Sequence, residues 1–244
     1  SPSPTTPASG RWTNVTLSRH VTALHAEAGT SRLWVATTSG LVVWDTAARS
    51  ATKVTVADGL LSNAVTAVHV DPAGRVWVGH EDGVSLSQDR RTWQALRDED
   101  GLEGVVVNAI VGDPDGGTWF ATYEGLMRRA PDGRIEVVRT PAALDGADFT
   151  CGLRDRAGRL WFGTDGAGLA RRDATGTWRI FTTSDGLPSA EVTTLAEAPD
   201  GRVWIGTAAG AARAEPSDRF TVFDQVRNEF GQFELGQVEA LAVA

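Results

Sequence analysis

Hydrophobic residues in this chain come in short runs, separated by polar stretches rich in Gly, Asp and Pro. In the segment 64–104, for example, runs at 64–70, 75–79, 84–89 and 92–98 are separated by "DPAG", "HEDG" and "RR". Each run has the length of a strand, and none has the spacing of an amphipathic helix. The pattern therefore predicts four short β-strands joined by tight turns.

One phrase of this pattern occurs five times, each time around a tryptophan. The copies are "SRLWVATTSG", "GRVWVGHEDG", "GGTWFATYEG", "GRLWFGTDGAG" and "GRVWIGTAAG". Their tryptophans are 43, 42, 42 and 43 residues apart, and they are Trp34, Trp77, Trp119, Trp161 and Trp204. A constant spacing in this range is the sequence signature of a repeat architecture.

The turns repeat as well. In "DPAG" (71–74), Asp, Pro and Gly occupy the positions that a type I turn favours. Related turns follow at 113–116, 155–158 and 198–201, and "DGL" closes three of the repeats. Four strands in each repeat of about 42 residues match one blade of a β-propeller. We therefore predict an all-β propeller of four-stranded blades.

The five tryptophans are predicted to be core residues. In "RVWVG" and "RLWFG" the residues beside the indole are apolar, so both faces of the strand are expected to be buried between packed blades. Each indole would bury on the order of 200 Å². At about 25 cal/mol per Å² this is roughly 5 kcal/mol before entropic losses. The Gly after the strand permits close approach between blades.

Two long stretches resemble the two-component-regulator propeller repeat. They are "DPAGRVWVGHEDGVSL" with "DGLEG", and "DRAGRLWFGTDGAGLARRD" with "DGLPSAEVTTLAEAPDGRVWIGT". The resemblance covers about residues 20–215 and departs at Ala36 and Ala121, where the repeat has Gly, and at His80, where it has Thr. It implies a propeller of the kind found in periplasmic sensor regions in front of histidine kinases.

We divide the chain into a disordered linker at 1–10 and a β-propeller at 11–244. The linker "SPSPTTPASG" is rich in Pro, Ser and Thr and has nothing to pack. The five complete blades are expected at about 20–61, 62–104, 105–147, 148–189 and 190–228.

The two ends of the chain are predicted to share a partial sixth blade. "RWTNVTLS" (11–18) has the pattern of a fourth strand and "VEALAVA" (238–244) that of a first strand. Because such a blade lacks its two middle strands, three interpretations stay open: the native chain continues past Ala244, the closure is irregular, or a partner supplies strands. Unpaired backbone groups favour strand addition from another chain.

Composition narrows the class of protein. A net charge of −8 and a pI near 5.0 argue against nucleic acid or an anionic membrane as the main partner. No apolar stretch approaches the length that spans a bilayer. A Pro- and Ser-rich tether commonly follows an export signal, so we expect an extracytoplasmic location. A lipid anchor ahead of Ser1 is a further hypothesis.

Catalytic chemistry is not predicted. The chain contains no His-Glu-x-x-His, Cys-x-x-Cys, phosphate-binding loop or Gly-x-Ser-x-Gly. His25 and His69 occupy equivalent first-strand positions, but the other blades carry apolar residues there, which argues against a shared metal. Cys151 is expected to be a small buried thiol. We therefore predict a protein that is not an enzyme and has no cofactor and no metal site.

Two groups of residues are candidates for contact with a ligand or a partner. A small ligand would bind where the loops between blades gather around the axis. The candidates on that face are Asp58, Asp100, Asp145 and Asp185. The candidates for partner contact, in the long loop "DQVRNEFGQFELGQ" and in two arginine pairs, are Phe230, Phe233, Arg128, Arg129, Arg171 and Arg172. The alternatives are a loop that packs its own Phe residues and a solvated strand face.

The predicted function is a non-enzymatic, extracytoplasmic interaction or scaffold subunit that docks on another protein or a membrane-associated complex. The alternative, implied by the resemblance, is a periplasmic input domain of a two-component system that senses an oligosaccharide-type ligand. A sensing domain requires an axial pocket with convergent polar groups, whereas "AVTAV" and its equivalents offer mostly small apolar side chains.

Overall fold

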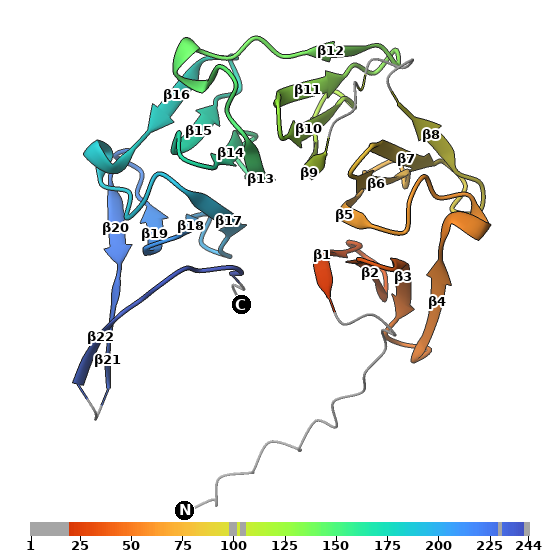
Figure 1. The fold of residues 1–244 in the computed structure, drawn as a ribbon, viewed down its shortest axis with the longest axis horizontal. Helices are drawn as coiled ribbons and strands as arrows, with labels where there is room; N and C mark the ends of the chain where they lie inside the picture. The colour runs from red at the N-terminus through yellow and green to blue at the C-terminus, as the bar shows by residue number, and fades with distance from the viewer. Residues whose placement is uncertain (1–19, 98–101, 103–105, 229–230, 242–244) are drawn as a thin grey trace, which may run out of the picture.

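The computed structural model describes residues 20–97, 102, 106–228 and 231–241, without the side chains of 226–234. This part of the chain forms five four-stranded antiparallel sheets around a central axis, as the blades of a propeller (Figure 1). It contains no α-helix. The ring is open between the first and the last blade.

Each blade consists of four consecutive strands, ordered outward from the axis. Blades 1 and 2 contain β1 (Val21–Ala26), β2 (Arg32–Thr37), β3 (Gly40–Asp45), β4 (Ser50–Val54), β5 (Val65–Val70), β6 (Val76–His80), β7 (Gly83–Ser87) and β8 (Gln94–Leu96). Blades 3 and 4 contain β9 (Val107–Gly112), β10 (Thr118–Thr122), β11 (Gly125–Arg129), β12 (Ile135–Val137), β13 (Phe149–Arg154), β14 (Leu160–Thr164), β15 (Leu169–Arg172) and β16 (Trp178–Phe181).

Blade 5 contains β17 (Val192–Glu197), β18 (Val203–Thr207), β19 (Gly210–Ala214) and β20 (Phe220–Phe223). Beyond it, β21 (Gln225–Asn228) and β22 (Gly231–Glu234) form a separate two-stranded sheet. Single-turn 3-10 helices lie between the outer strand of one blade and the inner strand of the next, and they are η1 (Val56–Asp58), η3 (Ala142–Leu144) and η4 (Thr183–Asp185).

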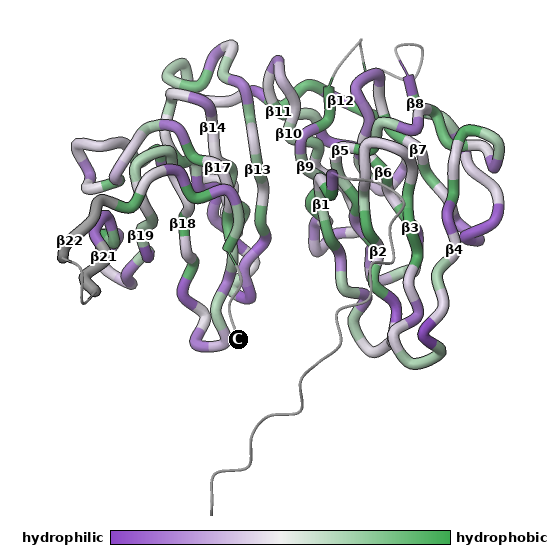
Figure 2. The backbone as a smooth tube through the Cα atoms, turned by 60° about the horizontal axis from the view of Figure 1, so that its bottom comes forward, coloured by the Kyte–Doolittle hydropathy of each residue, from purple (hydrophilic) through white to green (hydrophobic). Residues whose placement is uncertain are grey.

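The repeated "DPAG" turn forms as the sequence predicts. The N–H of Gly74 donates to the carbonyl of Asp71 at 2.8 Å, and Gly74 is left-handed, with φ of 81°. Asp71 Oδ1 accepts from the N–H groups of Ala73 and Arg75 at 3.0 and 2.9 Å. An Asp that bonds its own turn stabilises a sharp reversal between strands. Hydrophilic positions accordingly gather at the turns (Figure 2).

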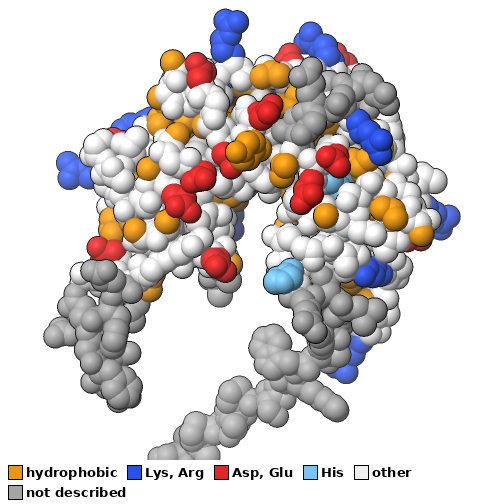
Figure 3. Space-filling model, in the orientation of Figure 1, with side chains coloured by type: hydrophobic (Ala, Val, Ile, Leu, Met, Phe, Trp, Pro, Cys, Tyr) orange, Lys and Arg blue, Asp and Glu red, His pale blue; other side chains and the backbone are white. Residues whose placement is uncertain are grey.

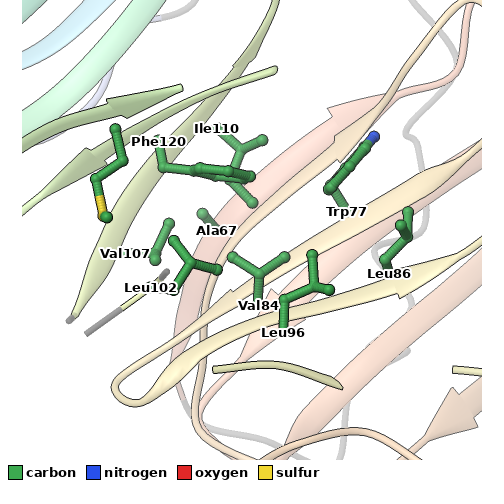
Figure 4. Close-up of a cluster of buried hydrophobic side chains, with 10 residues drawn as sticks. Ala67, Trp77, Val84, Leu86, Leu96, Leu102, Val107, Ile110 and Phe120 are labelled. Carbon is green, nitrogen blue, oxygen red and sulfur yellow. The ribbon is translucent and has the colours of Figure 1, made fainter. Parts of the chain in front are cut away.

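The seams between blades are filled by a tryptophan from one blade and apolar side chains from the next. Trp77 of β6 belongs to one buried cluster with Val107, Ile110 and Phe120 of blade 3 (Figure 4). The ring centroids of Trp77 and Phe120 are 5.9 Å apart. The tryptophans of blades 1 to 4 have at most 2% of their surface exposed, and they are Trp34, Trp77, Trp119 and Trp161.

The indole N–H of each of these four tryptophans donates a hydrogen bond to an acid. Trp161 Nε1 donates to Asp155 Oδ2 at 2.8 Å, and Arg159 Nε donates to the same oxygen at 2.6 Å. Because a buried donor without a partner is costly, these bonds keep the indole compatible with the core. The equivalent pairs in the first three blades are Glu27–Trp34, Asp71–Trp77 and Asp113–Trp119.

The Gly of the tryptophan phrase is required by the neighbouring blade. A Cβ placed on Gly163 would lie 2.5 Å from Cys151 Sγ and 2.6 Å from Val192 Cγ1. Val192 is the first residue of the next inner strand, so the Gly leaves room for that strand to approach. The repeat tolerates Ala at two of these places, and both Ala36 and Ala121 are fully buried.

The predicted propeller is confirmed in a five-bladed form, with one four-stranded blade for each tryptophan phrase. The partial sixth blade is not observed. Residues 235–241 form no strand, and 11–18 and 242–244 lie outside the described residues, as does the predicted linker at 1–10.

Candidate functional site

The ring formed by the described blades has a gap between blade 5 and blade 1. Neighbouring inner strands pack side by side from β1 through to β17, but no described strand joins β17 to β1 (Figure 1). Figure 3 shows the same opening, which leads to the hollow of the ring. We call it the open seam and define it by Val21 and Leu24 on blade 1 and Trp204 and Phe223 on blade 5.

The blade 1 side of the open seam exposes the first residue of its inner strand, which is buried in every other blade. Val21 is 51% exposed and Leu24 is 61% exposed. The first residues of the other four inner strands are at most 1% exposed, and they are Val65, Val107, Phe149 and Val192. In each of those strands this residue belongs to one buried cluster with the tryptophan of the preceding blade. No blade in the described part of the chain packs on this face of β1, which accounts for the exposure of Val21.

The blade 5 side shows the same effect on its tryptophan. Trp204 is partly exposed, unlike its four equivalents. Its ring packs on Phe223 with centroids 4.9 Å apart, and Phe223 is itself 37% exposed. The place of the acid that accepts from the indole in other blades is taken by Ala198. The fifth indole is therefore less enclosed than the others.

Each inner strand donates a side-chain hydrogen bond to the first residue of the next inner strand. The donor is the second residue of its strand, and the acceptor is a backbone carbonyl 2.5 to 2.9 Å away. The donor–acceptor pairs are Thr22–Val65, Thr66–Val107, Asn108–Phe149 and Thr150–Val192.

In blade 5 the carbonyl of Val238 accepts the equivalent hydrogen bond. Thr193, the second residue of β17, donates its hydroxyl to the carbonyl of Val238. A Cβ placed on Gly206 would lie 3.0 Å from Val238 Cγ1, much as one on Gly163 would lie 2.6 Å from Val192 Cγ1. Val238 therefore lies where the inner strand of a following blade would begin.

Two of the predicted ligand-face aspartates accept hydrogen bonds from backbone N–H groups of their own turns. Oδ2 of Asp58 accepts from the N–H of Thr55, and Oδ2 of Asp185 from the N–H of Thr182, both at 2.9 Å. Asp145 follows η3 directly. All three are exposed and belong to loops of three different blades. Asp100 lies outside the described residues.

The first predicted arginine pair lies along the seams. The guanidinium carbon of Arg128 is 5.7 Å from the centroid of Trp119 in its own blade, and that of Arg129 is 5.5 Å from Trp77 in the preceding blade. Arg128 also donates to Asp113 at 3.1 Å. Both arginines therefore cover tryptophans, in the geometry of a cation–π contact.

The second pair repeats this arrangement. Arg171 lies 5.3 Å from Trp161 in its own blade and Arg172 lies 5.3 Å from Trp119 in the preceding one. Arg171 also forms an ion pair with Asp218 of blade 5. Of the two predicted phenylalanines, Phe230 lies outside the described residues, and Phe233 lies in β22, where side chains are not described.

A pocket of about 970 Å³ lies at the axis, where the inner strands of blades 1 to 4 end. His25 and His69 line it with ring centroids 5.2 Å apart. Nε2 of His69 is buried and has no hydrogen-bond partner in the described part of the chain. Arg154 lines the same pocket, close enough to act on the charge of His69.

Both imidazoles of the pocket are held neutral. Burial lowers the pKa of His69 to about 4, and the charges of His25 and Arg154 act in the same direction, against that of Asp71. Burial also lowers the pKa of His25, against the charge of Glu27. At neutral pH the pocket therefore presents two uncharged imidazoles beside one guanidinium.

Three further observations concern chemistry and membranes. Across the described ranges, no three His, Cys, Asp or Glu side chains gather closely enough to hold a metal ion. Burial raises the pKa of the Cys151 thiol to about 11. No helix in this part of the chain is long and apolar enough to cross a membrane.

Reasoning from the sequence did not identify the residues of the open seam. Val21 and Leu24 look like ordinary core positions, since "VTAL" has the same apolar pattern as the other inner strands.

Two segments of the chain match a known family. Residues 59–82 and 186–209 match the family model "Two component regulator propeller". Each segment runs from a Gly-Leu step through the inner and second strands of a blade. No curated protein shows significant sequence similarity to the chain.

Solved structures share the fold. One is the extracellular domain of a protein assigned to the hybrid two component systems of B. thetaiotaomicron, with a TM-score of 0.70, 19% identity and coverage of 88% of this chain and 31% of that one. Virginiamycin B lyase from Staphylococcus aureus has a TM-score of 0.66 and 15% identity, over 84% of this chain and 71% of its own.

A third similar structure is PorZ, a surface component of the type-IX secretion system of Porphyromonas gingivalis. It has a TM-score of 0.62 and 18% identity, over 84% of this chain and 32% of its own. This chain thus spans about a third of the length of the two-component protein and of PorZ. At these identities the likeness shows the fold alone.

The lowered pKa of His69 predicts a loss of stability in acid. Because its pKa is about 4 in the folded protein and 6.5 ordinarily, the unfolded chain takes up the proton first as the pH falls from about 6.5 to 4. Val111 occupies the equivalent position in the next blade. His69→Val is therefore expected to reduce the loss in the free energy of unfolding by up to about 3 kcal/mol. Urea unfolding at pH 7 and pH 4.5 measures it.

His20→Val removes an exposed imidazole and serves as the control. An equal loss of stability in wild type and His69→Val between the two pH values would contradict the assignment.

Proposed function

We propose that this protein is a non-enzymatic extracytoplasmic subunit that binds another polypeptide at its open seam. Two of its segments match the two component regulator propeller model. The observation that carries the proposal is the contrast between Val21, 51% exposed, and its four buried equivalents. Full burial of one such side chain contributes about 1.5–3 kcal/mol, so a partner that covered the seam would gain from several residues at once. Contiguous exposed apolar surface typically marks an interaction site.

The comparisons support an extracytoplasmic location. One similar structure is an extracellular domain and another is a bacterial surface component. A net charge of −8 fits a protein or ligand partner better than nucleic acid.

Several side chains that could do chemistry have structural roles instead, which supports a non-enzymatic function. Asp71 and Asp155 accept from buried indoles, and Asp58 caps a turn. Burial raises the pKa of Cys151 and lowers that of His80 to about 4. Since lyases share this fold, the argument rests on these residues and not on the architecture.

A ligand-sensing function is the second candidate, favoured by the axial pocket. The buried, unpartnered Nε2 of His69 and the nearby Arg154 suit an acidic, oligosaccharide-type ligand. If this function holds, acidic oligosaccharides should raise the melting temperature of the wild type, and Arg154→Ala should abolish the shift. A shift that Arg154→Ala leaves unchanged would exclude this pocket.

The docking function predicts that one substitution at the seam prevents capture of the partner. The tagged chain should retain a discrete protein from a cell-envelope extract, and Leu24→Asp should reduce the retained amount at least about tenfold, because a charge in an apolar contact costs 1.4 kcal/mol or more.

Val137→Asp is the matched control, because Val137 is a 75% exposed aliphatic residue on the outer strand β12, away from the seam. Equal capture by Leu24→Asp and Val137→Asp would rule out the open seam as the docking site.

A further inference from the structure

We propose that a groove between blades 3 and 4 binds a small organic acid, with its carboxylate on Arg172 and its apolar part beside Trp178. The site lies in the closed part of the ring and is independent of the docking function. The equivalent place between blades 4 and 5 is filled by side chains of the protein itself, and it shows which group the groove accepts.

The groove has a volume of about 1100 Å³. It lies between the outer strand β12 of blade 3 and the turns that precede β14 and β16 of blade 4 (Figure 1). Its lining includes Trp119, Arg128, Leu160 and Arg172. The equivalent residues between blades 4 and 5 line a pocket of only about 180 Å³, and they are Trp161, Arg171, Val203 and Ala214.

Two glycines account for the larger volume. Gly117 stands where the next blade has Arg159, whose guanidinium carbon lies 5.3 Å from the centroid of its tryptophan. Gly176, in the turn between the third and fourth strands of blade 4, stands where blade 5 has Asp218. Both turn residues are left-handed, with φ of 93° and 58°. Because glycine has no side chain, neither position fills the seam.

The other three closed seams are bridged by polar contacts on this side of the ring. The bridging pairs are Glu27–Arg90, Arg75–Gly116 and Arg171–Asp218. Between blades 3 and 4, Arg128 occupies the position of Arg171 but pairs with Asp113 and Asp115 of its own blade. Within the described ranges, no ion pair therefore joins these two blades.

Arg172 is the cation that this arrangement leaves over. Its guanidinium carbon lies 5.3 Å from the centroid of Trp119, and none of the described acids forms an ion pair with it. A Cβ placed on Gly176 would lie 2.9 Å from Arg172 Nη2, so the glycine leaves room for the guanidinium. The neighbouring Asp173 accepts from backbone N–H groups of its own turn instead. The N–H donors of Arg172 therefore remain available to a ligand.

The pair between Arg171 and Asp218 shows which group those donors fit. Both carboxylate oxygens of Asp218 accept from the two terminal nitrogens of Arg171. The planar fork of a guanidinium matches a carboxylate in this two-bond geometry. A ligand carboxylate on Arg172 would supply the acid that Gly176 lacks. Arg139, an exposed lining residue, adds a second positive charge.

The remaining wall of the groove is apolar. Val137, Val138, Leu160 and Trp178 line it, and Val137 is 75% exposed. Trp178 packs edge-on against Trp119 with centroids 6.4 Å apart, which fixes its position. Small-molecule sites commonly combine an apolar wall with a few polar groups that orient the ligand. The groove is therefore suited to an organic acid with an apolar ring.

Phenylacetate is the probe, titrated into the 244-residue chain and followed by saturation-transfer NMR. We expect a Kd of about 1 mM. Phenylacetamide has the same shape without the charge, and it should bind at least about tenfold more weakly. Acetate has the charge without the ring, and it should also bind at least about tenfold more weakly.

Variants of the chain locate the binding. Arg172→Ala, which introduces the residue type of Ala214, should weaken phenylacetate binding at least about tenfold. Arg129→Ala is the matched control: Arg129 lies over Trp77 in the same way, but in the seam that Arg75 bridges. It should leave the binding unchanged.

A double variant separates loss of the site from loss of stability. Arg172→Ala combined with Gly176→Asp copies the pattern of blade 5, so the new carboxylate should pair with Arg128 across the seam. We expect this protein to unfold in urea at the wild-type midpoint and to bind no phenylacetate.

Three results would each overturn the inference. They are absence of phenylacetate binding to the wild type, equal binding of phenylacetamide, and equal binding by the Arg172→Ala and Arg129→Ala variants.

Discussion

The structure depends on one contact, the packing of a tryptophan from one blade on the first residues of the next inner strand. Four such contacts hold the five blades together, and each indole is at most 2% exposed. The other repeated features serve this contact. The acid of the turn accepts from the indole N–H, the arginines cover its face, and the small residue two places later lets the next strand approach. A blade whose neighbour is missing therefore exposes a predictable group of side chains.

This dependence explains how much of the fold the sequence predicts. The spacing of 42 or 43 residues and the Asp-Pro-x-Gly turns determine the blade, because they are local features of the chain. The burial of Trp77 was predictable, since the residues that surround it belong to two adjacent repeats. The exposure of Val21 was not, because it depends on what lies beside the first blade, and the inner-strand pattern there is the same as elsewhere.

The candidate sites were harder to predict for a related reason. Asp58 and Asp185 look like free carboxylates in the sequence, yet each bonds a backbone N–H three residues earlier. Arg129 and Arg172 look like a solvated strip, yet each lies over a tryptophan of the preceding blade. In a repeat protein a polar residue at a repeated position is commonly part of the repeat.

The most direct test of the account is the solvent exposure of Trp204 relative to Trp77 in the isolated chain. Incorporation of 5-fluorotryptophan, with assignment by single Trp→Phe substitutions, gives each indole its own fluorine signal. The account predicts that a soluble paramagnetic quencher broadens the signal of Trp204 and leaves that of Trp77 sharp. Equal protection of both indoles would mean that the ring is closed in solution, and the open seam would not exist.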